Sequence, residues 1–361
     1  MKVTIGIPCF KANNTICRCL SSIQIQTYKD IEIILAADHP DDDYQFVLSR
    51  YPDLNIKILN CEKNTGPGLA RQRALDAATG EWITFIDADD VFYTPFAIES
   101  LINGIDDDII EVEGMFLQEV SKMPDGTRLI PQQNVNHPWV FGRLYNIEFL
   151  RDNKIQFSEL RAMEDGEFNW KIGLIIEGTP FKINVIDEVV YVWLEGSDHS
   201  ITRIGTIDGI PQYDFDLCPL GATEAAIRAV NFCRKINPFN SSIMRFATEQ
   251  MVDKYFTYIE CAEKRPIFLE QNFFIAKKFY NECYKDYEHL ISDNVLKNIY
   301  TTELANRSHD LIDIIPCITF FDFFKKIKNE EYKGQKELEE IRAKMPKEII
   351  DNDIKSGVIS F

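Results

Sequence analysis

Short apolar runs alternate with longer amphipathic stretches over the first hundred residues. Four runs are continuous, as is typical of strands buried on both faces. They are Val3–Phe10, Ile31–Ala37, Ile56–Cys61 and Trp82–Ile86. Helices are expected between them, at Thr15–Gln26 and from a Gly-Pro-Gly turn through Ala78. This alternation predicts a parallel sheet with covered faces.

The pattern changes in the middle of the chain. Two apolar stretches, Asp108–Glu119 and Arg128–Gln132, flank the turn residues Met123–Gly126, which predicts a hairpin. Further on we expect helices at Val140–Asp152 and Gly166–Ile176, a strand at Val185–Leu194 and a polar loop at Glu195–Thr202.

Beyond Asp214 the periodicity is helical. The helices expected there are Thr223–Ile236, Ser242–Glu263 and Leu269–Leu290. The Gly- and Pro-dotted stretch Gly205–Gly221 is the best candidate for a boundary. We therefore predict an α/β domain over residues 1–210, followed by a smaller all-helical domain over residues 211–361.

Charge and composition narrow the class of protein. The net charge is −18 with a pI near 4.8, which argues against a broad surface for nucleic-acid phosphates. Nine scattered cysteines and an N-terminus that opens on a strand favour free thiols and a cytoplasmic location. The most apolar stretch, Leu311–Phe324, is broken by charges, so we expect a core helix there. A peripheral membrane contact through this stretch and the lysines after it stays open.

Acidic residues follow two of the predicted strands. Asp38 follows the second strand, and Asp87-Ala88-Asp89-Asp90 follows the fourth. In parallel sheets ligands bind at the carboxyl ends of the strands. Carboxylates at such an end suit a hard divalent cation, and a nucleotide diphosphate leaving group needs one. The alternative is an ordinary solvated turn, since the D-x-D pattern is short and common.

Several spaced segments in one order resemble glycosyltransferase family 2. The resemblance covers roughly residues 1–204. Its segments are the opening strand Val3–Phe10, Cys19–Ile23 with Gln26-Thr27-Tyr28, Glu32-Ile33-Ile34 leading to Asp38, Asn64-Thr65-Gly66 with Ala70-Arg71, Phe85–Asp90, Gly142–Tyr145, Phe157 and Glu164-Asp165.

The resemblance implies a GT-A fold, which is the Rossmann-like fold of nucleotide-diphospho-sugar transferases, and an inverting transfer of a hexose or pentose to an acceptor hydroxyl. It implies a Mn²⁺ or Mg²⁺ cofactor and a nucleotide-sugar donor, with UDP expected. The donor residues it implies are Pro8, Phe10, Asp38, Asn64, Arg71, Asp87 and Ala88. The implied metal ligands are Asp89, Asp87 and His199, and Asp165 is the implied general base.

Each of these residues has a simpler interpretation. Asp38 can cap a strand end, and Arg73 can take the place of Arg71. Glu164-Asp165 can stabilise a helix N-terminus through its dipole, and His199 can be a solvated loop residue.

The sequence also departs from the family pattern. Ala37 replaces the first member of an acidic pair, Phe10 stands where a tyrosine is common, and Val192-Trp193-Leu194 lacks an arginine. These departures leave the sugar and base open.

The sequence leaves several alternatives open for the acceptor and for the function. A glycan or lipid-linked oligosaccharide is the expected acceptor, and a modified base in phage DNA is an alternative. A sugar nucleotidyltransferase would need a basic Gly-rich loop after the first strand, where Lys11-Ala12-Asn13-Asn14 stands instead. A catalytically silent nucleotide-sugar-binding module and a donor hydrolase complete the alternatives. The helical domain is expected to help form the acceptor cleft or a homodimer interface.

Overall fold

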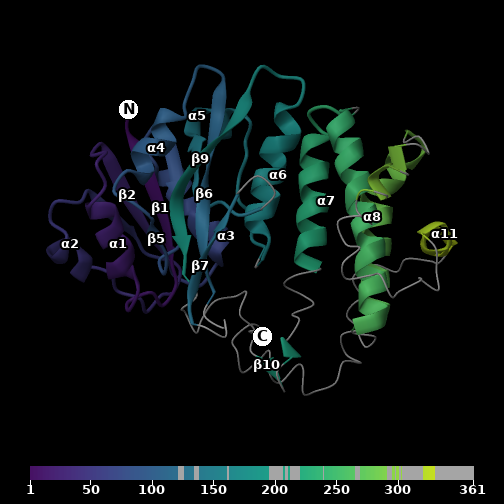
Figure 1. Cartoon of the computed structure of the whole chain (residues 1–361), viewed down its shortest axis with the longest axis horizontal. Helices are drawn as coiled ribbons and strands as arrows, with labels where there is room; N and C mark the ends of the chain where they lie inside the picture. The colour runs from purple at the N-terminus through teal and green to yellow at the C-terminus, as the bar shows by residue number, and fades with distance from the viewer. Residues whose placement is uncertain are drawn as a thin grey trace. The chain divides into compact units, whose positions relative to one another are not determined.

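The computed structural model divides the chain into two compact units, Met1–His199 and Ser200–Phe361 (Figure 1). The structure describes residues 1–120, 126–133, 138–160, 162–194, 206–207, 210–211, 220–238, 240–264, 269–290, 295–296, 298–300, 302 and 320–329. The expected boundary at Gly205–Gly221 lies a few residues beyond the division between the units.

The first unit is built on a nine-stranded sheet in the order β3-β2-β1-β4-β8-β6-β9-β5, with β7 paired to β6. The first four of these strands run parallel to one another, as the alternation predicted. They are β1 (Val3–Cys9), β2 (Ile31–Ala37), β3 (Ile56–Leu59) and β4 (Trp82–Phe85). The helices between them are α1 (Ile16–Gln24), α2 (Phe46–Arg50) and α3 (Pro67–Ala77).

Side chains of β1 alternate between two packed faces, because successive residues of a strand point to opposite sides. Val3, Ile5 and Ile7 lie in the core cluster that contains the apolar face of α1. On the other face, a Cβ at Gly6 would come within 2.9 Å of the Phe85 ring. Glycine at this position therefore lets β4 and α3 approach the central strand closely.

The second half of the sheet joins the parallel half through an antiparallel strand. Strand β8 (Arg143–Asn146) runs antiparallel to β4 and to β6 (Ile109–Val120). Strand β6 pairs antiparallel with β7 (Arg128–Gln132), which confirms the predicted hairpin. The remaining elements are β5 (Val91–Phe92), β9 (Lys182–Trp193), α4 (Ala97–Asn103), α5 (Ile147–Asp152) and α6 (Glu164–Ile176).

The prediction of one helix over Val140–Asp152 is wrong in its first half. Residues 143–146 form β8, and only residues 147–152 are helical. The Asn146 side chain accepts a hydrogen bond from the Phe149 amide at 2.9 Å, so the helix begins there. Arg143 takes a strand conformation because its buried guanidinium pairs with Glu111 and Glu113 on β6. Tertiary ion pairing overrides the local pattern at this point.

Most of the described second unit is helical. Its elements are β10 (Thr206–Ile207), β11 (Ile210–Pro211), α7 (Gly221–Cys233), α8 (Ser241–Lys264), α9 (Leu269–Glu282), the 3-10 turns η4 (Tyr284–Asp286) and η5 (Glu288–Leu290), and α11 (Phe320–Asn329). Phe323 of α11 is fully buried against Tyr255, Tyr258 and Phe273. Within the stretch Leu311–Phe324, Phe323 thus packs in a core, as expected for a core helix.

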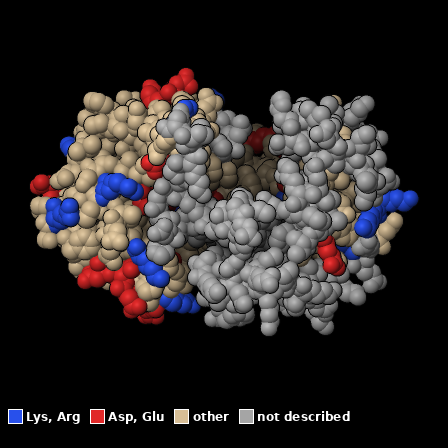
Figure 2. All heavy atoms as spheres, turned by 60° about the horizontal axis from the view of Figure 1, so that its bottom comes forward, with Lys and Arg blue, Asp and Glu red and all other residues tan. Residues whose placement is uncertain are grey.

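None of the helices that the structure describes is long and apolar enough to cross a membrane. On the face drawn in Figure 2, the described Lys and Arg side chains form small separate groups interleaved with Asp and Glu. This face of the described chain therefore presents no broad basic surface to a polyanion.

Candidate active site

The carboxyl ends of β1, β2 and β4 meet at one edge of the sheet. Cys9 pairs with Ala37, and Gly6 pairs with Phe85, so the residues after each strand are neighbours. Asp38 follows β2, and Asp87–Asp90 follow β4. This is the edge at which ligands bind in open parallel sheets.

Asp38 holds the loop that precedes α3. Its Oδ1 accepts hydrogen bonds from the amide and the hydroxyl of Thr65 at 3.0 and 2.6 Å, and its Oδ2 accepts one from the Gly66 amide at 2.7 Å. Arg73 lies 3.4 Å from Oδ1 and also donates to the Ala37 carbonyl at 2.6 Å. Asp38 is only 3% exposed, so it fixes the loop whether or not it also meets a nucleobase.

Phe10 and His39 extend from the ends of β1 and β2 as an edge-to-face pair, with ring centroids 5.7 Å apart. The Lys11 ammonium lies 5.1 Å from the Phe10 ring centroid. The Lys11 amide donates to Asp42 at 2.6 Å, which fixes the loop between β1 and α1. Phe10 is 40% exposed, so its ring is open to a ligand. His39 is a neighbour that the sequence did not single out.

Three other predicted donor residues lie around this edge. Pro8 is half-buried on β1, and Ala88 is buried at 5% exposure after β4. Asn64 is exposed, and its Oδ1 accepts a hydrogen bond from the Gly66 amide at 3.1 Å. Asn64 therefore shapes the same loop as Asp38. His199 lies outside the described residues.

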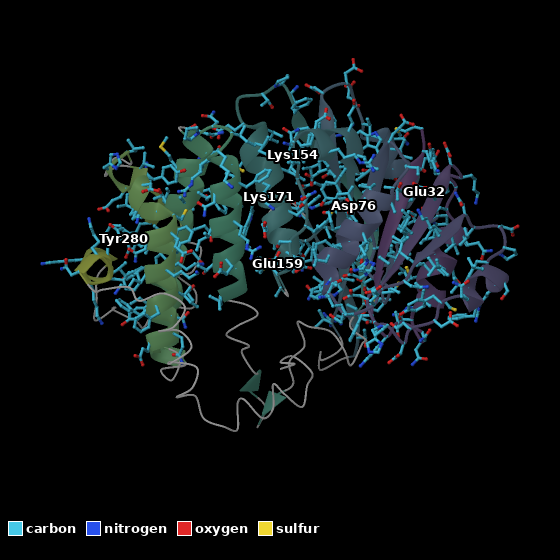
Figure 3. All side chains as sticks on the ribbon, turned by 180° about the vertical axis from the view of Figure 1, so that it is seen from behind. Glu32, Asp76, Lys154, Glu159, Lys171 and Tyr280 are labelled. Carbon is cyan, nitrogen blue, oxygen red and sulfur yellow. The ribbon has the colours of Figure 1, made fainter. Side chains whose placement is uncertain are left out.

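Arg71 on α3 joins two segments that are far apart in the sequence. Its Nη2 donates to Asp87 Oδ1 at 2.8 Å, and its Nη1 donates to Glu164 Oε1 at 2.6 Å. Burial lowers the pKa of the guanidinium, but the carboxylates of Asp87, Glu164 and Asp165 outweigh that effect and raise it. Arg71 therefore stays charged, and it connects the end of β4 with the first turn of α6. Asp76 and Lys171 mark α3 and α6 in Figure 3.

Two adjacent carboxyl groups begin α6. Burial, followed by the negative charge of Asp165, raises the pKa of Glu164 to about 8. Burial also raises the pKa of Asp165, although the Arg71 guanidinium opposes the rise. Asp165 accepts one hydrogen bond, from the Gly166 amide at 2.8 Å. A carboxyl whose pKa is raised towards neutrality suits proton transfer.

Asp87 and Asp89 offer carboxylate oxygens for a cation. Asp87 is 34% exposed in its side chain, and its Oδ1 accepts a hydrogen bond from Arg71. Asp89 is half-buried, and its backbone carbonyl accepts a hydrogen bond from Arg18 at 2.5 Å. Within the described ranges, no three His, Cys, Asp or Glu side chains form a complete metal site. Mg²⁺ and similar hard cations take one or two carboxylates and complete their shell with substrate phosphates, so these residues fit a cation that binds together with a diphosphate.

Asp90 has a structural role that the sequence did not reveal. It is 1% exposed, and its carboxylate accepts hydrogen bonds from the Tyr191 hydroxyl at 2.6 Å and the Leu194 amide at 2.7 Å. The Tyr191 oxygen in turn accepts one from the Asp87 amide at 3.2 Å. Asp90 thus ties the acidic segment to the end of β9. A hydrogen bond between residues a hundred positions apart leaves no local signal in the sequence.

Comparison with protein families gives one match to this region. Residues 4–157 match the family described as Glycosyl transferase family 2. The matched segment contains the Asp38 loop, Arg71 and the Asp87–Asp90 cluster, and it ends before Glu164 and Asp165. The match confirms the family resemblance over the first half of the site.

Two curated relatives are glycosyltransferases by name. Glycosyltransferase GlyA of Streptococcus pneumoniae is 26% identical over 217 residues, covering 53% of this chain and 30% of GlyA. The Escherichia coli enzyme WfgD, a UDP-Glc:α-D-GlcNAc-diphosphoundecaprenol β-1,3-glucosyltransferase, is 36% identical over 90 residues, covering 25% of this chain and 36% of WfgD. The chain thus spans about a third of the length of these relatives.

Among solved structures, TarS residues 1–349 of S. aureus in complex with UDP-GlcNAc superimpose with a TM-score of 0.62 at 19% sequence identity. The superposition covers 86% of this chain and 92% of that one. At this level of identity the likeness is one of fold, and it confirms the α/β fold expected from the sequence.

Proposed function

Residues 4–157 of this chain are a glycosyltransferase family 2 domain, and from that premise we propose that the protein transfers a sugar from a nucleotide-diphospho-sugar to an acceptor hydroxyl. The observation that carries the proposal is the bridge of Arg71 between Asp87 and Glu164. It brings the carboxylates after β4 next to the carboxyl groups that begin α6. One site thus has groups suited to a diphosphate leaving group and a group suited to an acceptor proton.

Asp165 is the proposed general base. As the acceptor oxygen bonds to the anomeric carbon, its proton passes to the Asp165 carboxylate, and the bond from that carbon to the diphosphate oxygen breaks. A single in-line displacement of this kind inverts the anomeric centre and leaves no covalent intermediate on the protein. The raised pKa of Asp165 supports this role, because a stronger base accepts the proton more readily.

Asp89 and Asp87 are the proposed ligands of a divalent cation, with His199 as a further candidate from the sequence. The cation would neutralise the charge that grows on the diphosphate as the glycosidic bond breaks. Phe10, Asp38 and the loop at Asn64 are proposed to form the nucleotide site. UDP is the proposed nucleotide, because the name of WfgD gives UDP-Glc as its donor and TarS was crystallised in complex with UDP-GlcNAc.

A thermal-shift screen tests the donor half of this proposal. UDP-, GDP-, dTDP- and CMP-sugars are added with Mn²⁺ or Mg²⁺ to the wild type and to Asp89→Ala. A ligand at ~100 times its dissociation constant stabilises the fold by ~2.7 kcal/mol, so the right pair gives a clear rise in Tm. We expect one UDP-sugar with one metal to stabilise the wild type selectively, and Asp89→Ala to lose that rise.

Release of UDP tests turnover in the same preparations. The wild type should release UDP slowly from the stabilising donor without an acceptor, since water can replace the hydroxyl. A donor that binds with no UDP release under any condition would instead indicate a silent binding module. An equal thermal shift in Asp89→Ala would remove the metal assignment.

A further inference from the structure

A row of aromatic rings leads from the core to the surface beside the proposed site. The Phe141 ring is stacked on Tyr191, with centroids 4.6 Å apart and planes 10° apart, and Trp139 is stacked on Phe141 at 5.4 Å and 17°. Trp193 lies 5.3 Å from Trp139. Phe141 and Tyr191 are buried, whereas Trp139 and Trp193 are partly exposed. The outer end of the row thus presents indole rings.

Hydrogen bonds fix this row to both halves of the proposed site. On one side, the Tyr191 hydroxyl donates to Asp90, and the Leu194 amide next to Trp193 donates to the same carboxylate. On the other side, the Asn169 amide donates to the carbonyls of Pro138 and Trp139 at 2.7 and 3.0 Å. The rings are therefore held beside the acidic segment after β4.

Asn169 also relates Trp139 to the proposed base. It lies four residues after Asp165 on α6, and residues at this spacing share one face of a helix. A Cβ at Gly166 would come within 3.2 Å of Pro138, so the first turn of α6 touches the segment that carries Trp139. The backbone of Trp139 is thus tied to α6, the helix that begins with Glu164 and Asp165.

We propose that Trp139 and Trp193 form a stacking platform for the acceptor, and that the acceptor is an uncharged pyranose residue. The inference rests on the proposed function and names the acceptor class for it. The electron-rich face of an indole attracts the polarised C–H groups on one face of a sugar ring. Stacking at this place brings a ring hydroxyl towards Asp165.

The charge of the surroundings selects against phosphate-bearing acceptors. Asp87, Asp89, Glu164 and Asp165 are all carboxyl groups, and the guanidinium of Arg71 is already paired with two of them. A polyol phosphate or a DNA strand would bring further negative charge into this set. An open-chain polyol also lacks the flat ring face that the indoles would contact.

An acceptor panel with the full-length protein tests this inference. UDP-glucose and UDP-N-acetylglucosamine are supplied with Mn²⁺, and UDP release is followed with octyl β-glucoside, octyl β-galactoside, octyl N-acetyl-β-glucosaminide, ribitol phosphate or glycerol phosphate as acceptor. We expect at least one octyl glycoside to raise UDP release above the acceptor-free rate, and neither polyol phosphate to do so.

Trp193→Ala then separates stacking from a structural role. Loss of the stacked indole is expected to raise the KM for the glycoside about tenfold, which corresponds to ~1.4 kcal/mol. The kcat at saturating glycoside should change little, and Trp193→Tyr should recover most of the affinity. Phe181→Ala, which removes an exposed aromatic ring just before the other end of β9, is the control and should leave the KM unchanged.

Three results would overturn the inference. The first is use of a polyol phosphate with no response to any glycoside. The second is a protein that hydrolyses the donor but that no glycoside stimulates. The third is a Trp193→Ala variant in which kcat falls while the KM for the glycoside stays unchanged. Absence of both donor binding and UDP release in the wild type would instead remove the proposed function, and this inference with it.

Discussion

Arg71 is the one described side chain that connects the carboxylate of Asp87 with that of Glu164. Its side chain is 7% exposed, and the buried Glu164 carboxyl and the half-buried Asp87 carboxyl both pair with it. A buried ion pair contributes little compared with an apolar pair of the same volume, but removal of one partner leaves the other charge unpaired. The intact ion pairs of Arg71 therefore add little to the free energy of unfolding, whereas removal of Arg71 is expected to lower it strongly.

Arg71→Met is expected to lower the free energy of unfolding by about 3–5 kcal/mol at neutral pH. The loss should shrink at acid pH, where protonation removes the charge of the carboxylates left without Arg71. Urea titrations of the two proteins at both pH values provide the measurement. Arg50→Met, at an exposed position on α2, serves as the control and should have little effect at either pH. A loss that does not depend on pH would mean that packing, not charge, is what Arg71 contributes.

Asp165 gives the second expectation at this scale. A general base works in its ionised form, and burial raises the pKa of this carboxyl above 3.8. The rate of sugar transfer should therefore rise as the pH rises through that increased pKa, and level off above it. Asp165→Asn should lose this acidic limb and reduce kcat by about 10²–10⁴.

The matching control is Glu177→Gln, at a position just beyond the other end of α6. This variant should keep both the acidic limb of the pH–rate profile and the kcat of the wild type. Donor binding, followed by thermal shift, should survive in Asp165→Asn. An unchanged pH profile in that variant would assign the proton transfer to another group.

Part of this site can be predicted from the sequence, because some of its residues directly follow strands that the local pattern predicts. Asp38 and Asp87 follow apolar strands directly, so the pattern that predicts the strands also places the carboxylates. The partner of Arg71 cannot be obtained in this way, because Glu164 is 93 residues away. The sequence also left Arg71 and Arg73 as alternatives, whereas the structure directs them to different carboxylates.

At the scale of the element, β6 and β8 share a buried ion cluster. Glu111 and Glu113 lie two residues apart on one face of β6, and Arg143 of β8 donates to both. All three side chains are less than 10% exposed. Burial is the largest cause that raises the pKa of Glu111, to about 7; the Arg143 charge opposes it, and the nearby Glu113 adds to it.

The sign of this shift sets a pH dependence. The pKa of Glu111 is higher in the folded state than its ordinary value of 4.5, so its stabilising contribution is complete below pH 4.5 and is lost as the pH rises to about 7. Glu111→Gln cannot ionise. As the pH rises through this window, the wild type should lose stability and the variant should not. The unfolding free energy of the variant minus that of the wild type should therefore increase.

Denaturant titrations at several pH values provide the test for Glu111→Gln. Glu148→Gln, at an exposed position in the first turn of α5, is the control and should give a flat difference. A constant difference for Glu111→Gln as well would show that the carboxyl titrates at its ordinary pKa in the fold.

The same strands explain why the fold could be predicted only in part. The parallel strands β1 to β4 are continuous apolar runs, and their type and order along the chain follow from that pattern. Strand β8 carries Arg143 and Asn146 among apolar residues, and its spacing fits a helix equally well. Its conformation depends on the carboxylates of β6, which sequence periodicity does not contain.

At the scale of the whole molecule, cation and nucleotide binding should be coupled. The proposed ligands Asp87 and Asp89 are two carboxylates, and hard cations bound in this way complete their shell with substrate phosphates, so we expect the diphosphate to provide further oxygens. Isothermal titration should give weak Mn²⁺ binding to the protein alone and binding at least about tenfold tighter with UDP present. By linkage, Mn²⁺ should tighten UDP binding by the same factor.

Asp89→Ala should abolish this coupling, whereas Asp53→Ala, at an exposed position beyond α2, should keep it. Tight Mn²⁺ binding without nucleotide would contradict the shared site. It would point to ligands that lie outside the described residues, of which His199 is the candidate from the sequence.

The order in which the two halves of the proposed site occur along the chain has a consequence for recombination between related genes. The proposed nucleotide residues and the carboxylates of Asp87 and Asp89 come before α4, and the proposed base and aromatic platform come after it, so one crossover near residue 105 would exchange the acceptor half. Side-chain pairs that cross that point within the site include Arg71 with Glu164 and Asp90 with Tyr191. A functional chimera therefore has to inherit a carboxylate at position 164 and a hydroxyl at position 191 from its second parent.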